Sequence, residues 1–303
     1  MTGPPLTPRH VSVCICTFKR PELLLRTLEQ VSRQETNREF TFSIVVTDND
    51  ERESARTAVE AFRQRSAVDV VFCVEPRQNI ALARNRAVLN AKGDFIVFID
   101  DDEFPTPDWL RQLIRAIDTY NAAGVLGPVR PHFEQPPPQW VVEGRFCERP
   151  EYPTGHVIQW HHARTGNVLF KRAIVEGSWP PFDPAFHNGG EDMDFFRRMT
   201  NEGHTFVWCN EAVVLESVPA ARLTRSYMLR RALLRGKNIL KHSGGRTRFL
   251  AISLLALPAY ALAIPVVSIL GQHVLMKYSI SFCDHLGRIL GLVGLNPVSS
   301  RDL

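Results

Sequence analysis

The chain has 303 residues, of which 44% are hydrophobic and 22% are charged, enough to bury one large core or two moderate ones. Its formal net charge is only +4, which does not indicate a nucleic-acid partner, and we expect none. The positive charge is uneven, because nine basic residues and no acidic residue lie between Arg222 and Arg248. Such a block indicates a phosphate-bearing partner or an anionic membrane surface.

Apolar stretches of strand length alternate with amphipathic stretches along the first 130 residues. We expect strands at 11–16, 42–47, 69–75 and 95–99, and helices at 21–33, 53–65, 79–91 and from Thr106 onward. Thr106 has helix-capping chemistry, and Pro107 suits the first position of a helix. This alternation predicts an α/β fold with a doubly wound, mostly parallel sheet.

The composition changes beyond Gly127. Six prolines lie between residues 131 and 155, so we expect an irregular, mobile excursion there that borders the functional site. A short strand at 165–170 and a helix beginning near Asp192 are expected to follow.

The sequence GDFIVFIDDDEFP, residues 93–105, is the strongest functional signal. An apolar strand buried on both faces would present Asp100, Asp101 and Asp102 at its C-terminal end, where α/β sheets bind their ligands. Adjacent carboxylates repel one another unless a cation compensates. The run therefore predicts a site for Mn²⁺ or Mg²⁺ that shares phosphate oxygens with a substrate; an acidic, solvated loop is the alternative.

A second acidic pair, Glu191 and Asp192, follows Gly189 and Gly190. The glycines allow a turn that aims both carboxylates inward at the start of a helix. Ordinary capping of a helix N-terminus explains the pair equally well when it is considered alone.

These motifs, in the order FIDDDEFP and then GGEDMDF, resemble those of family 2 inverting glycosyltransferases of the GT-A fold. The resemblance covers residues 10–240. The segment VPAARLTRSYMLRRALLRG is similar to the tail of bacterial members that act in cell-surface polysaccharide synthesis. The resemblance implies a catalytic domain at 1–243, with a nucleotide-binding half at 10–130 and an acceptor half at 131–243.

The resemblance also implies roles for individual residues. Asp102, supported by Asp100, would hold the metal, and Asp192 would be the catalytic base while Glu191 orients the acceptor; the last two could be exchanged. The donor would be contacted by residues after the first strands and in the third helix, with the alternative that Arg84 is a surface arginine. These donor-binding residues are Thr17, Arg20, Asp48, Asn79, Arg84, Asp100 and Asp101.

The basic stretch at 225–242 is expected to form a helix. Arg231 and Arg235 could bind the donor diphosphate or a lipid diphosphate on the acceptor, because arginine recognises phosphate with paired donors. The alternative is a solvated face on an amphipathic helix.

Residues 249–270 contain no charged side chain and are long enough to cross a hydrocarbon core of about 30 Å. Arg246 and Arg248 precede them, which predicts a cytoplasmic N-terminal side. We therefore expect a membrane-associated tail at 244–303 and a location on the cytoplasmic face of the inner membrane. A buried helical hairpin or a dimer interface is the alternative, and 274–295 is expected to be an amphipathic or returning helix.

We therefore predict a metal-dependent inverting glycosyltransferase that moves a sugar from a nucleoside-diphosphate sugar, with UDP favoured, to a hydroxyl of a lipid-linked or envelope glycan. A sugar nucleotidyltransferase could use the same sheet and metal, but the glycine- and lysine-rich loop expected after its first strand is missing. A non-catalytic nucleotide- or glycan-binding protein is a third possibility, and it would not need the complete set of acidic residues.

Overall fold

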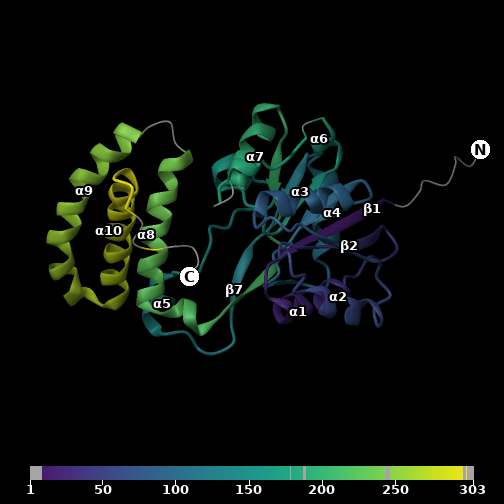
Figure 1. Cartoon of the computed structure of the whole chain (residues 1–303), viewed down its shortest axis with the longest axis horizontal. Coiled ribbons are helices and arrows are strands. Elements are labelled where there is room, and N and C mark those ends of the chain that lie inside the picture. Colours follow the sequence, from purple (N-terminus) through teal and green to yellow (C-terminus); the bar gives the residue numbers. More distant parts are fainter. Residues whose placement is uncertain (1–8, 178, 187–188, 243–245, 296–297, 299–303) are drawn as a thin grey trace, which may run out of the picture. The chain divides into compact units, whose positions relative to one another are not determined.

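The computed structural model describes residues 9–177, 179–186, 189–242, 246–295 and 298 (Figure 1). Contacts divide the chain into two compact units. The first unit comprises Met1–Arg130 and Arg149–Glu216, and the second comprises Pro131–Glu148 and Ser217–Leu303.

A seven-stranded sheet forms the centre of the first unit, with strand order β3-β2-β1-β4-β8-β6-β9. Its strands are β1 His10–Thr17, β2 Thr41–Asp48, β3 Val70–Val74, β4 Phe95–Phe98, β6 Gly124–Leu126, β8 Val168–Lys171 and β9 Phe206–Trp208. β8 runs antiparallel to both of its neighbours, whereas the remaining pairs are parallel. The predicted mostly parallel sheet is confirmed.

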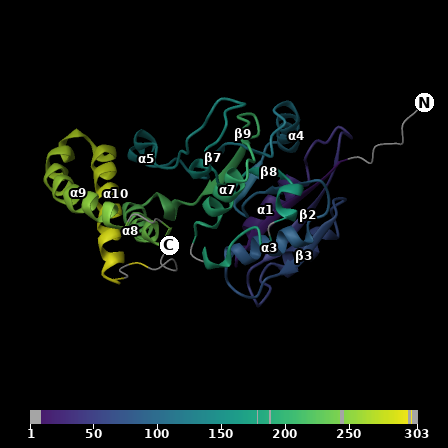
Figure 2. The same cartoon turned by 90° about the horizontal axis from the view of Figure 1, so that it is seen from above.

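Helices cover both faces of this sheet, as a doubly wound fold requires (Figures 1 and 2). They are α1 Pro21–Val31, α2 Arg56–Arg63, α3 Ile80–Asn90, α4 Trp109–Thr119, α6 Ala173–Glu176 and α7 Glu191–Asn201, with 3-10 turns at Trp160–His162 and Pro184–Phe186. Alternate β1 side chains point to opposite faces. Val13 packs with residues of α1 and α4, whereas Cys14 packs with residues of α3 and α7.

The helix expected from Thr106 begins later, at Trp109. Residues Glu103–Pro105 instead form a short strand, β5, which pairs with β10 (Val214–Val218). The backbone of Thr106 continues this pairing, since its N–H donates to the carbonyl of Val213 at 3.1 Å. Tertiary pairing therefore extends the chain through the predicted helix start, and a small sheet of order β5-β10-β7 results, with β7 at Val129–Phe133.

The proline-rich segment is more regular than predicted. It contains the end of β7 and a helix, α5, at Gln139–Gly144. Pro138 occupies the N-cap of α5, where the helix does not need the N–H group that proline lacks. The prediction of an irregular excursion is therefore wrong for these residues, while its mobility stays a prediction.

The second unit consists mainly of helices. After a 3-10 turn at Ala220–Leu223 come α8 Arg225–His242, α9 Arg246–Val267, a second 3-10 turn at Ser268–Leu270, and α10 Gln272–Leu292. α10 lies between α8 and α9 and packs against both, as both views show (Figures 1 and 2). Because α8 groups with the later helices, the division by contacts differs from the expected boundary at residue 243, and the proposed functional division stays a prediction.

Candidate active site

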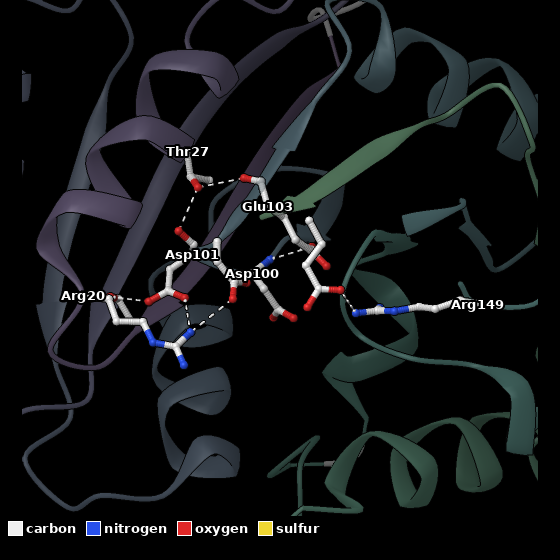
Figure 3. Close-up of polar contacts among 9 residues, drawn as sticks. Arg20, Thr27, Asp100, Asp101, Glu103 and Arg149 are labelled. Carbon is white, nitrogen blue, oxygen red and sulfur yellow. Dashed lines mark hydrogen bonds and ion pairs between the residues drawn. The ribbon is translucent and has the colours of Figure 1, made fainter. Parts of the chain in front are cut away.

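The acidic loop after β4 is held by α1. Thr27 of that helix donates its hydroxyl to the carbonyl of Asp101 at 2.9 Å and is also 2.7 Å from the carbonyl of Glu103 (Figure 3). The N–H of Asp100 donates to Glu103 Oε2 at 3.0 Å. Asp101, Asp102 and Glu103 are all buried, so several negative charges are concentrated away from solvent.

Two of the predicted donor-site residues stabilise this negative charge, Thr17 by a hydrogen bond and Arg20 by its positive charge. Thr17, at the end of β1, donates to Asp101 Oδ2 at 2.7 Å. Arg20, just before α1, places Nη1 3.3 Å from both Asp101 Oδ1 and Asp102 Oδ2. The structure thus brings residues from the first loop and the acidic run together, as the motif order predicts.

Burial controls the protonation of this cluster. It raises the pKa of Asp101 to about 6, although the hydrogen bond from Thr17 and the charge of Arg20 act in the opposite direction. Burial and the neighbouring Asp100 raise the pKa of Glu103 well above its usual range. A cation placed among these carboxylates would reverse both tendencies.

Gly166 lies beside two of the carboxylates. A Cβ at this position would be 3.0 Å from Glu103 Oε1 and 3.1 Å from Asp100 Oδ2. Glu103 Oε1 is buried and has no hydrogen-bond partner among the described residues. The glycine therefore keeps free space next to an unpaired acceptor oxygen.

These carboxylates would suit a divalent cation for which the protein supplies only some of the ligands. No group of three or more His, Cys, Asp and Glu side chains in the described part of the chain is arranged to hold a metal ion. Mg²⁺ and similar hard ions, however, commonly use one or two carboxylates and complete their coordination with substrate phosphates and water. Asp100 and Asp102 are suitable ligands for such an ion.

The second acidic pair begins α7. Gly189 and Gly190 both have φ of +100°, a backbone conformation that favours glycine, and Gly190 is the N-cap. The turn directs Glu191 into the protein, where it is buried and forms an ion pair with Arg84 of α3. Arg84 is itself buried, so the alternative of a surface arginine is wrong.

Asp192 has a different environment from that of Glu191. It is only half-buried, and its Oδ1 accepts a hydrogen bond from the N–H of Met193 at 2.8 Å. Its Oδ2 is 4.0 Å from Nε of Arg164. Arg164 is held in turn by the carbonyl of His161, to which Nη1 donates at 3.1 Å.

Arg84 connects the two acidic sites electrostatically. Burial alone would lower the pKa of Arg84, but the carboxylates of Glu191, Asp100 and Asp192 raise it above its ordinary value. The carboxylates after β4 and those at the start of α7 therefore act on the same guanidinium.

Two other predicted donor-site residues, Asp48 and Asn79, form hydrogen bonds with backbone groups. Asp48 is fully buried and accepts hydrogen bonds from the N–H groups of Asp50 at 3.1 Å and Ala55 at 2.7 Å. Asn79 caps α3 by accepting from the N–H of Ala81 at 2.9 Å, and it donates to the carbonyl of Pro184 at 2.9 Å. Their donor contacts stay predictions.

Arg231 and Arg235, the two arginines of α8 that we expect to bind a diphosphate, lie in the second unit. Arg235 forms an ion pair with Asp284 of α10, whereas Arg231 is exposed. The predicted contacts of both with a diphosphate also stay predictions.

Sequence reasoning missed three residues that shape these sites. Arg149 forms an ion pair with Glu216. Its positive charge lowers the pKa of Glu103, but the burial of Glu103 is the larger influence and raises that pKa. Arg149 lies in the proline-rich segment, and Arg164 follows a pair of histidines. Neither belongs to a recognisable motif, and only the order of residues in a DDDE run pointed to Glu103.

Comparison with known proteins decides the family. The model of glycosyl transferase family 2 matches residues 12–178, more than half of the chain. The chain belongs to glycosyl transferase family 2. It is therefore a glycosyltransferase, and the predicted relationship to polysaccharide-synthesising members is confirmed by the relatives described next.

The succinoglycan biosynthesis protein ExoM of Rhizobium meliloti (strain 1021) is 35% identical over 233 residues, covering 75% of this glycosyltransferase and 73% of ExoM. The hyaluronan synthase of Pasteurella multocida is 26% identical over 239 residues, covering 66% of this chain but 24% of the synthase. This chain thus corresponds to one part of that larger enzyme.

Solved structures confirm the GT-A fold. The mannosyltransferase PcManGT from Pyrobaculum calidifontis, in complex with GDP-Man and Mn²⁺, has a TM-score of 0.60 at 18% identity, with 95% of this chain and 87% of that chain covered. Residues 1–349 of S. aureus TarS, in complex with UDP-GlcNAc, have a TM-score of 0.56 at 14% identity, with 95% and 93% covered.

Proposed function

We propose that this family 2 enzyme transfers a sugar, with inversion, from a UDP-sugar to a hydroxyl of a lipid-linked or envelope glycan. The observation that carries the proposal is Arg84, which forms an ion pair with Glu191 and whose pKa is also raised by the charge of Asp100. A donor site and a base must lie close together for a single displacement. The UDP-GlcNAc bound by TarS and the polysaccharide role named for ExoM support the donor and acceptor classes.

On the donor side, Asp100 and Asp102 would hold Mn²⁺ or Mg²⁺. The ion would offset the negative charge that develops on the leaving diphosphate. Thr17 and Arg20 hold Asp101 and Asp102 in place, and the half-exposed guanidinium of Arg20 is available to a phosphate oxygen. The Mn²⁺ in the PcManGT complex supports this arrangement.

On the acceptor side, Asp192 takes the proton from the attacking hydroxyl. A base must reach the acceptor, and Asp192 is half-buried, whereas Glu191 is buried and paired with Arg84. This difference favours Asp192 over Glu191, the choice that the sequence left open. Glu191 would act through Arg84, by fixing the arginine between the two acidic sites.

We further propose that the second unit attaches the enzyme to the cytoplasmic face of the inner membrane. Leu250–Leu270, most of α9 and the turn after it, is the one helical segment in the described part of the chain that is long and apolar enough to cross a bilayer, and only 11% of its apolar 18-residue window is buried. A helix so little buried does not fit the alternative of a buried hairpin. The basic run that precedes it supports the cytoplasmic side.

Family membership favours glycosyl transfer over both rival functions, a nucleotidyltransferase and a non-catalytic binding protein. The test is release of nucleoside diphosphate from a panel of nucleotide sugars, with Mn²⁺ and a membrane lipid extract as the source of acceptor. We expect turnover with a UDP-sugar in the wild type. Formation of a nucleotide sugar from a sugar phosphate, without its consumption, would contradict the proposal.

Asp192→Asn tests the base directly. We expect kcat to fall roughly 10²- to 10⁴-fold with little change in the KM of the donor, because the amide cannot accept the proton. Glu202→Gln, an exposed residue after the C-terminal end of the same helix, is the matched control and should keep full activity. Full activity of Asp192→Asn would remove Asp192 from this role.

A further inference from the structure

α9 presents an uninterrupted apolar stripe to solvent. Its most exposed large side chains are Leu255 at 77%, Leu262 at 78% and, in the following turn, Ile269 at 82%. They are spaced by seven residues, so they lie along one side of the helix. Ile252, Leu254, Val266 and Leu270 add to the exposed apolar surface.

The other side of α9 faces α10 through polar and aromatic contacts. Ser253 is fully buried, with its Oγ 3.0 Å from Nδ1 of His285. The ring of Tyr260 lies 5.6 Å from that of Tyr278 and 5.8 Å from that of His285, between centroids. α9 therefore has one exposed apolar side and one side that contacts α10, although residues 249–270 carry no charge.

α10 is joined closely to the basic helix α8. A Cβ on Gly236 of α8 would be 2.0 Å from the carbonyl oxygen of Asp284, and a Cβ on Gly287 of α10 would be 2.2 Å from that of Leu233. The two backbones are thus in contact at glycines. The ion pair between Arg235 and Asp284 adds a charged contact between the same helices.

This packing argues against a helix that crosses the bilayer. α10 begins directly after the turn that ends α9 and lies alongside it, so the two helices share the same depth. If α9 spanned the hydrocarbon core, Asp284 would be carried into it, together with Arg235 and the neighbouring arginines of α8. Charged side chains are costly at the bilayer centre, where they are seldom found facing lipid.

We infer that α9 lies in the plane of one leaflet of an anionic phospholipid bilayer, inserted by the stripe of Leu255, Leu262 and Ile269, with α10 and α8 on its aqueous side. The inference rests on the membrane attachment proposed above and gives its geometry. Arg246 and Arg248, which begin α9 itself, complement anionic lipid at the same surface. A second copy of the chain would bring like-charged residues to the same interface.

The depth of the stripe tests this geometry. A fluorophore is attached to Leu255→Cys, Leu262→Cys or Ile269→Cys in the full chain, after replacement of the half-exposed Cys16, Cys73, Cys147 and Cys283 by Ser. Quenching by lipids brominated at shallow or deep positions of the acyl chain then reports depth. We expect one shallow depth for all three sites, and the same label at Lys277→Cys, an exposed position of α10, should stay in water.

A spanning helix gives a different result. Successive labels would differ in depth by about 10 Å, since an α-helix rises 1.5 Å per residue. That graded profile would overturn the in-plane inference while leaving membrane attachment intact.

Vesicle flotation separates the geometry from attachment itself. We expect the wild type to float with phosphatidylcholine vesicles that contain phosphatidylglycerol and to float less with phosphatidylcholine alone. Leu255→Asp combined with Leu262→Asp should weaken binding roughly 100-fold, since two apolar side chains are lost from the lipid contact. Leu89→Asp, on an exposed apolar residue of α3, is the matched control and should bind normally.

Two outcomes would overturn the inference at this step. One is unchanged binding of the double variant. The other is a dimer that is stable in gel filtration without lipid and does not bind vesicles, and that is absent in the double variant. The second result would also remove the proposed membrane attachment, but it would leave the proposed sugar transfer, which is measured by release of nucleoside diphosphate, unaffected.

Discussion

The two acidic sites of the first unit accommodate buried negative charge in different ways. After β4, the carboxylates share several partners, among them Thr17, Arg20 and Arg149, and some of these partners reach solvent. At the start of α7, Glu191 depends on one buried arginine, Arg84. The comparison indicates that the first site can exchange partners for a cation or a phosphate, whereas the second is a fixed contact.

Removing Arg84 should have the largest effect. Arg84→Met leaves Glu191 buried without its cation, so we expect the free energy of unfolding to fall by about 3–5 kcal/mol in denaturant titrations. Adding Glu191→Gln should recover much of this loss, because the unpaired charge is removed. A double variant as unstable as Arg84→Met alone would show that lost packing, and not lost charge, explains the effect.

A methyl group at Gly166 tests the acidic site after β4, which we call the adaptable site because its partners can be exchanged. In Gly166→Ala the new Cβ forces Glu103 and Asp100 to shift, so we expect a stability loss of about 1–2 kcal/mol. Calorimetry should show binding of UDP with Mn²⁺ weakened by roughly tenfold, which corresponds to about 1.4 kcal/mol. Gly177→Ala is the control, since a Cβ there meets nothing within 4 Å. Equal affinity of the two variants for UDP would show that Gly166 does not influence the metal site.

Loss of Arg20 should affect stability less. Its side chain is 45% exposed and its contacts with Asp101 and Asp102 are 3.3 Å long, so we expect Arg20→Ala to lose less than about 1 kcal/mol in thermal or denaturant unfolding. The KM of the donor should increase, because the phosphate contact is removed. A loss as large as that of Arg84→Met would end the distinction between an adaptable and a fixed site.

The smallest expected effect is a dependence of the free energy of unfolding on pH. Burial raises the pKa of Glu191 above its ordinary value of 4.5, although the charge of Arg84 opposes the change. The folded state then holds a proton that the unfolded state has released, so the contribution to stability is greatest below pH 4.5 and is lost as pH rises through the folded pKa. Wild type should therefore lose stability relative to Glu191→Gln as pH rises over this range. Parallel curves of unfolding free energy against pH would contradict the shift.

Local pattern was sufficient for much of the fold. The alternation of strands and helices, the acidic run after β4 and the glycine turn before α7 are encoded within short segments, and family membership follows from their order. The start of α4 was misplaced because Glu103–Pro105 pairs with β10, which lies more than a hundred residues later in the chain. The proline content of 131–155 does not predict α5, because a proline at a helix N-cap, such as Pro138, is compatible with the helix that follows it.

Neighbouring residues alone specify the acidic runs, the ends of the strands and the charge-free stretch at 249–270. The pairing of Arg84 with Glu191 across 107 residues, the place of Arg164 beside Asp192 and the packing of α10 between α9 and a charged helix are visible only in the folded chain. Such contacts depend on the packing of elements far apart in the chain. The partners of each carboxylate, and hence its burial and charge, follow from that packing.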